Sequence, residues 1–239
     1  MTNHIRTLTV VFDTKIHSKE IPLFRGAILK RLGEKANVLY HNHIGDSSYR
    51  YSYPLIQYKR LRGNAAIVCV EEGADVIGQY LLESTDTVTL GEREVRLTTG
   101  KLFPARILMQ TWQSSFSYHI CRWLPLNTKN YHLYRMMDDE NERKMLLESI
   151  LKGNLLSMLK GLGIYLEDEL LVRITNLEPP YVVYNKGVGI MAFNADFTSN
   201  LSIPNNIGIG KNASIGFGVV WQDRNNDDNK NYIQHHGIQ

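Results

Sequence analysis

The order of periodic segments in the first hundred residues constrains the fold of this chain more than any other feature. Residues 7–12 alternate apolar and polar side chains as a half-buried strand does, and residues 22–32 carry apolar side chains at helical spacing. Strand-like stretches follow at 49–60 and 65–70, a helical stretch at 75–82 and a hairpin pattern at 87–99. The resulting order of strand, helix, two strands, helix and strand is that of a ferredoxin-like unit.

The second half of the chain also mixes strands and helices. Strand-like stretches at 105–112 and 115–123 precede the clearest helical pattern, from Glu140 to Lys160. Acidic residues crowd the start of this helix, where its dipole favours negative charge. Its predicted apolar face consists of Met145, Leu146, Ile150, Leu151, Leu155, Leu156 and Leu159. Further strands are expected at 170–177, 181–193 and 217–221.

These patterns predict an α+β protein in two parts. We place the N-terminal unit at residues 1–105 and the C-terminal unit at 106–222. The remaining residues, 223–239, are mostly Asp, Asn, Lys and Gln with few apolar side chains, and this composition predicts a disordered tail.

Charge is distributed unevenly over the 239 residues, although the net charge is only +3. Residues 1–65 hold 11 Lys and Arg against 4 Asp and Glu, whereas the rest of the chain holds 16 against 20. A basic N-terminal third suggests an anionic partner such as nucleic acid, and a solvated basic face is the simpler alternative on charge alone.

The two cysteines, Cys69 and Cys121, lie far apart and form no CxxC pair. This spacing argues against a disulfide scaffold or a zinc finger and fits a reducing cytoplasm. The sequence has no apolar run of about 18 residues, and its N-terminus lacks the apolar region of a secretory signal. We therefore expect a cytoplasmic protein that does not associate with membranes.

A glycine-rich segment near the C-terminus is the most distinctive motif. It reads GIGKNASIGFG from Gly208 to Gly218, two Gly-x-Gly pairs separated by five residues. Glycines allow sharp turns and close backbone approach to a ligand, and successive N–H groups can cradle a phosphate. The spacing fits neither a dinucleotide-binding fingerprint nor a Walker A loop, and no helix pattern follows. A glycine-rich hairpin with no ligand is the alternative.

Four segments, in their order along the chain, resemble motifs of the CRISPR-associated endoribonucleases that cut CRISPR repeat RNA. These enzymes form the Cas-six family of the repeat-associated RNA-binding superfamily. Leu23–Ile28 resembles the first-helix motif of the family. Tyr40–His43 followed by Tyr51–Lys59 resembles its histidine segment and the next strand, and Leu151–Gly161 resembles a long helix of one branch. The fourth segment is the glycine-rich one, and the resemblance covers most of the chain.

The resemblance implies two tandem ferredoxin-like (βαββαβ) units and cleavage of precursor CRISPR RNA within each repeat. The ribose 2′-OH attacks the adjacent phosphate without a metal or other cofactor, which leaves a 2′,3′-cyclic phosphate and a 5′-hydroxyl. The implied partner is CRISPR repeat RNA, with other effector subunits and a second copy of the chain as further candidates. A non-catalytic RNA-binding subunit of an effector complex is the alternative function, and an unrelated α+β scaffold is a third.

Histidine is the side chain best suited to proton transfer near neutral pH. Alignment with the family places His43 at the catalytic histidine, with His41 as the second candidate and Tyr49 as a candidate for orienting the nucleophile. The sequence shows no firm equivalent of the lysine that some family members use. The His-Asn-His sequence does not indicate an HNH nuclease, because the ββα-metal fold of those enzymes has no counterpart in the pattern here. A His-x-His metal site would need a third ligand, and the sequence offers none nearby. Histidines that only satisfy loop backbone remain the simpler alternative.

The expected RNA contacts come from the glycine-rich segment and from basic side chains near the histidines. The basic side chains are expected to meet phosphates, although a purely solvent-facing role fits the sequence as well. The predicted RNA-binding residues are Gly208, Gly210, Lys211, Gly216, Gly218, Arg25, Lys30, Arg31, Arg50 and Lys59.

Overall fold

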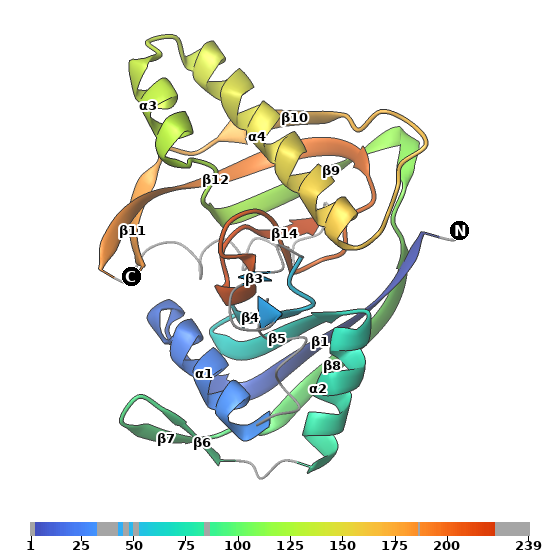
Figure 1. The fold of residues 1–239 in the computed structure, drawn as a ribbon, viewed down its shortest axis with the longest axis vertical. Helices are drawn as coiled ribbons and strands as arrows, with labels where there is room; N and C mark the ends of the chain where they lie inside the picture. The colour runs from blue at the N-terminus through green and yellow to red at the C-terminus, as the bar shows by residue number, and fades with distance from the viewer. Residues whose placement is uncertain are drawn as a thin grey trace. The chain divides into compact units, whose positions relative to one another are not determined.

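The computed structural model describes residues 3–32, 43–44, 48–49, 53–83, 87–185 and 187–222. The chain divides into two compact units (Figure 1). The N-terminal unit holds residues 3–108 together with Ser214–Gly216, and the C-terminal unit holds 109–213 together with 217–222. The predicted tail at 223–239 lies outside the described residues. Among the described residues, no helix is long and apolar enough to cross a membrane.

The N-terminal unit is built on a four-stranded antiparallel sheet in the order β4-β5-β1-β8. Its strands are β1 (His4–Lys15), β4 (Ile56–Leu61), β5 (Asn64–Val70) and β8 (Thr99–Leu108). Helices α1 (Ile21–Leu32) and α2 (Glu72–Glu83) follow the first and third of these strands, and η1 (Ser18–Glu20) precedes α1. This connectivity and strand order are those of a ferredoxin-like unit, as the sequence predicts.

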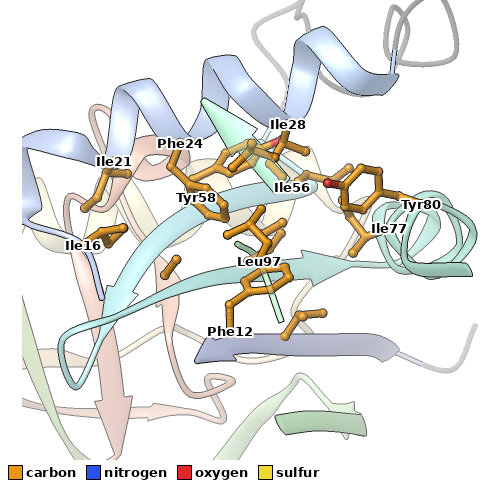
Figure 2. Close-up of a cluster of buried hydrophobic side chains, with 14 of the residues drawn as sticks. Phe12, Ile16, Ile21, Phe24, Ile28, Ile56, Tyr58, Ile77, Tyr80 and Leu97 are labelled. Carbon is orange, nitrogen blue, oxygen red and sulfur yellow. The ribbon is translucent and has the colours of Figure 1, made fainter. Parts of the chain in front are cut away.

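The core of this unit lies between the helices and one face of the sheet (Figure 2). Phe24 of α1 packs edge-to-face against Phe12 of β1 and Tyr58 of β4, with ring centroids 5.8 and 5.6 Å away. Ile77 of α2 is also fully buried in this cluster. Aromatic pairs at these distances stabilise a core beyond the area they bury.

Three local expectations for this unit are wrong. The fourth strand is β8, and the hairpin of β6 (Thr87–Leu90) and β7 (Arg93–Arg96) forms a separate two-stranded sheet before it. Residues 105–108, expected at the start of the C-terminal half, complete β8. The expected single strand at 49–60 is also divided, because β4 begins only at Ile56 and Tyr49 belongs to a short strand, β3.

The C-terminal unit repeats the same strand order with β10-β12-β9-β14, in which β12, β9 and β14 pair antiparallel. The bounds are β9 (Thr111–Trp123), β10 (Val172–Leu177), β12 (Val188–Leu201) and β14 (Val219–Gln222). Short β13 (Ile207–Gly208) extends the sheet beside β14, and β11 (Tyr181–Asn185) forms a hairpin with β12. The expected ferredoxin-like order is therefore present in both units.

The second crossover of the C-terminal unit departs from the ferredoxin-like pattern. Between β12 and β14, residues 202–218 hold β13 and the short 3-10 helix η3 (Ala213–Ile215) where an α-helix would otherwise stand. The glycine-rich segment lies within this crossover. Its composition explains the difference, because glycines and polar residues disfavour a long helix.

The first crossover contains α3 (Thr128–Met136), which the sequence did not predict, and α4 (Glu140–Gly161), which it did. Asn127 caps α3 by accepting a hydrogen bond from the Asn130 backbone N–H at 2.8 Å. The predicted apolar face of α4 is partly wrong, because Met145 and Leu156 are exposed. Leu151, Leu155 and Leu159 are buried as predicted, and Leu147 and Met158 are buried with them.

Candidate functional site

The histidine segment contains a small antiparallel pair of strands. Strand β2 (His43–Ile44) pairs with β3 (Ser48–Tyr49), and His43 and Tyr49 are partners in the register. Opposed residues in an antiparallel ladder have Cα atoms about 5 Å apart. The backbone therefore brings two of the three predicted catalytic residues together. His41 and Arg50 lie outside the described residues.

The first helix presents its basic side chains away from the core. Ile21, Phe24 and Ile28 are buried, whereas Lys30 and Arg31 are exposed in the last turn. Arg25 is half-buried. Cations in the last turn of a helix are favoured by its dipole, and they remain accessible to an anionic partner.

Lys59 differs from the other basic candidates because its side chain is completely buried. Nearly all of β4 is buried, on both faces of the strand, so the period-2 alternation that would expose every second residue does not apply. The expectation that Lys59 meets RNA phosphates from the surface is therefore wrong for this arrangement, and we do not retain it as an RNA contact.

A buried tyrosine holds the backbone at the start of the glycine-rich crossover. The Tyr118 hydroxyl of β9 donates to the Leu201 carbonyl and accepts from the Ile203 N–H, both at 2.9 Å. Burial raises the pKa of Tyr118 to about 12, so the hydroxyl keeps its proton near neutral pH. Farther along, the Ile209 N–H donates to the Gly218 carbonyl at 2.8 Å, which closes the glycine-rich segment into a loop.

At three of the four predicted glycines an added Cβ would lie close to other atoms of the protein. A Cβ added at Gly210 would lie 2.6 Å from Asn154 Oδ1, and one at Gly218 would lie 1.9 Å from the Ile209 carbonyl oxygen. At Gly216 a Cβ would lie 2.8 Å from Ile21 Cδ1. All three glycines also have positive φ angles, between +59° and +82°. Gly208 pairs with Val219 in the sheet.

Lys211 is the charged side chain of this loop, and it is exposed. It follows Gly210 (φ +79°) and precedes Asn212 (φ +60°), so left-handed residues on both sides turn the backbone sharply around it. This placement displays one cation at the bend of the loop. Among the predicted residues of the segment, Lys211 is therefore the one most directly available to a phosphate.

A second histidine environment was not anticipated from the sequence. His119 of β9 lies opposite Asp196 of β12, with Nδ1 and Oδ1 2.6 Å apart, and its ring contacts the Trp221 ring in a tilted arrangement with centroids 4.5 Å apart. The hydrogen bond with His119 lowers the pKa of Asp196 below its usual range, and partial burial opposes this shift. The residues are far apart in sequence, so no local pattern reveals the pair.

No group of three or more His, Cys, Asp or Glu side chains in the described part of the chain is placed to hold a metal ion. The cysteines Cys69 and Cys121 are both buried.

Two family models match the chain in tandem. Residues 3–106 match the Cas6b N-terminal domain, and residues 110–222 match the Cas6b C-terminal domain. Together they span nearly all of the described residues. These matches confirm the resemblance to the Cas-six (Cas6) family and rule out the interpretation as an unrelated scaffold.

Solved structures agree with these matches. A crystal structure of Cas6b is similar with a TM-score of 0.84 and 25% identity, over 92% of this chain and 100% of that chain. A structure described as a CRISPR RNA processing endoribonuclease Cas6b shares the fold with a TM-score of 0.72 and 24% identity, over the same shares. An uncharacterized protein of Methanocaldococcus jannaschii is 43% identical over 101 residues, 42% of this chain and 67% of the relative.

Proposed function

Because the chain belongs to the Cas6 family, we propose that it is an endoribonuclease that cleaves precursor CRISPR RNA within its repeats. The observation that carries this proposal is the match of both Cas6b domain models, in order, over nearly the whole described chain. The similarity to a structure described as a CRISPR RNA processing endoribonuclease supports it.

The proposed chemistry needs no metal or cofactor. The ribose 2′-OH loses its proton to a general base and attacks the adjacent phosphorus, while the bond from phosphorus to the 5′-oxygen breaks. A general acid protonates the departing 5′-oxygen. The products carry a 2′,3′-cyclic phosphate and a 5′-hydroxyl. Each proton transfer by a positioned side chain typically contributes about 10²–10⁴ in rate.

His43 and His41 are the proposed acid and base, and Tyr49 is proposed to orient the reacting groups. The register of β2 and β3 supports this assignment, since it pairs His43 with Tyr49 across two adjacent strands. Residues this close in the backbone are able to act on one scissile phosphate.

RNA binding is proposed to involve the exposed cations of α1 and the glycine-rich loop. Lys30 and Arg31 at the end of α1, Arg25 earlier in the same helix and Lys211 in the loop supply positive charge. Contacts of this kind with phosphates are independent of base sequence and weaken as salt rises.

Single-turnover cleavage of a labelled repeat RNA from the same genome tests the proposal. We expect full cleavage in EDTA, and none when the ribose at the cut site is replaced by a 2′-deoxy sugar, because the nucleophile is then missing. His43→Ala should slow cleavage by about 10²–10⁴ while leaving the affinity for the repeat nearly unchanged. His132→Ala, at an exposed position on α3, serves as the matched control and should retain the full rate.

Other outcomes would contradict parts of the proposal. Cleavage of the deoxy substrate, or a requirement for added magnesium, would exclude the 2′-OH mechanism. Full rates in both His43→Ala and His41→Ala would place the catalytic groups elsewhere. Tight binding without cleavage by the wild-type protein would favour the alternative, a non-catalytic RNA-binding subunit that acts with other effector subunits or as a homodimer.

A further inference from the structure

A hollow in the N-terminal unit is lined mainly by basic side chains. Its volume is about 730 Å³, and it is open to solvent. The lining comes from the end of β1 and the residues after it, from η1, from β4 and the turn that follows it, and from β7. Its charged side chains are Lys15, Lys19, Arg60, Arg62 and Arg93, with Glu20 as the one carboxylate among the lining residues. None of the residues singled out by the sequence motifs is among them.

The fold brings two of these cations to one point. A Cβ added at Gly63 would lie 3.5 Å from Lys15 Nζ and 3.7 Å from Arg60 Nη2. Gly63 has a φ of +84° in the tight turn between β4 and β5, a conformation that favours glycine, and both cationic groups lie beside this turn. The Ile16 carbonyl accepts from Arg60 Nε at 2.8 Å, which holds the guanidinium in place.

The carboxylate of the hollow is paired with one of its cations. Glu20 accepts from Arg93 Nη2 at 2.8 Å and from the His17 backbone N–H at 2.7 Å. Because the lining holds five cations and this one carboxylate, positive charge predominates around the hollow. Like charges held close together repel one another, and an anion that enters the hollow relieves this repulsion.

We propose that this basic hollow binds the sugar-phosphate backbone of the substrate RNA. The identity of the RNA rests on the function proposed above. The cations come from four separate elements, so they match a polyanion that presents several phosphates better than a single small anion. Three of the five cations are arginines, whose planar guanidinium groups bind phosphate oxygens in pairs. The contact is independent of base sequence, because it involves phosphates alone.

The test compares two triple variants with the same change in charge. Lys15→Gln, Lys19→Gln and Arg62→Gln remove three exposed cations of the hollow. Lys101→Gln, Arg106→Gln and Lys129→Gln remove three exposed cations that do not line it. The dissociation constant of a labelled repeat RNA, and of an unrelated RNA of equal length, is measured for each variant at several salt concentrations.

We expect the hollow variant to bind both RNAs roughly tenfold more weakly. The slope of log affinity against log salt should fall by about 0.7 for each phosphate that the variant no longer neutralises. The control variant should stay close to wild type. At saturating protein the single-turnover cleavage rate of the hollow variant should match that of wild type, because these residues lie outside the proposed catalytic set. If the triple variant does not fold, Lys19→Glu alone provides the same comparison against Lys101→Glu.

Equal affinities and equal salt slopes for the hollow and control variants would overturn the proposal. The proposal would also be overturned if the hollow variant bound inorganic pyrophosphate more weakly than wild type but bound RNA equally well. The hollow would then be a site for small anions. If the wild-type protein cleaves repeat RNA and the hollow variant binds that RNA normally, the inference about the hollow is contradicted and the proposed function is not. A wild-type protein that binds RNA through the hollow without cleaving it contradicts the proposed function alone.

Discussion

Replacement of Gly210 by alanine should destabilise the C-terminal unit through one contact. The added Cβ would lie 2.6 Å from Asn154 Oδ1, far inside ordinary contact distance. The same Oδ1 accepts a hydrogen bond from Trp123 Nε1 at 2.9 Å, and Trp123 is completely buried. The methyl group must therefore displace the Asn154 amide and leave the indole N–H without its acceptor.

Two costs add at this position. An alanine at φ +79° costs about 1–2 kcal/mol in backbone strain. A buried N–H that loses its acceptor costs about 1–3 kcal/mol more. Gly210→Ala should thus lower the free energy of unfolding by about 2–5 kcal/mol, a large share of the stability of an ordinary domain. All three tryptophans of the chain lie in the C-terminal unit, so urea unfolding followed by tryptophan fluorescence measures this unit.

A matched glycine and a double variant separate the two costs. Gly163 has a φ of +69° and nothing within 4 Å of an added Cβ, so Gly163→Ala should show the strain alone. Asn154→Ala removes the displaced amide, so the cost of Gly210→Ala in that background should fall to the strain cost. If Gly210→Ala costs no more than Gly163→Ala, or if its cost is unchanged in the Asn154→Ala background, the reasoning is refuted.

Three further predictions concern the loop and the sheet that supports it. Lys211→Ala should reduce the salt slope of RNA binding by about one phosphate contact with little change in stability, and an unchanged slope would remove Lys211 from the RNA contacts. Tyr118→Phe should lower the free energy of unfolding by about 1–3 kcal/mol in urea titrations, because Leu201 and Ile203 each lose a buried partner; a cost below about 0.5 kcal/mol would contradict this. The lowered pKa of Asp196 means that its pairing with His119 stabilises the fold above about pH 4 and is lost as the pH falls through the lowered value. The stability difference between wild type and Asp196→Asn should therefore shrink as the pH falls below about 4, and a difference that stays constant there would exclude the Asp196 carboxylate as the source of the pH dependence.

Periodicity predicted the N-terminal unit well because its elements each bury one face. The stripe of Phe24 and Ile28 on α1 and the alternation of Val10 and Phe12 on β1 both point into one cluster. The same reasoning failed at Lys59, because β4 is buried on both faces and its pattern no longer alternates with solvent. It also missed α3, where few side chains are buried to set a period.

The glycine-rich segment illustrates which properties could be predicted from the sequence and which required the structure. The spacing of its glycines, together with three other segments, was enough to suggest the family, because chemical motifs are local and keep their order along the chain. What each glycine does was decided only by tertiary structure. Gly210 makes room for Asn154, 56 residues earlier in the chain, and Gly216 makes room for Ile21 at the other end of the sequence.

The sequence by itself therefore determined the class of fold, the family and the segment that carries the candidate histidines. Tertiary structure alone decided the pairing of His119 with Asp196 and the gathering of Lys15, Arg60 and Arg62 around one turn. The physical reason is the range of the interactions. Helical and strand periodicity depend on neighbours a few residues apart, whereas charge clusters and buried pairs depend on strand register and on loops that join distant parts of the chain.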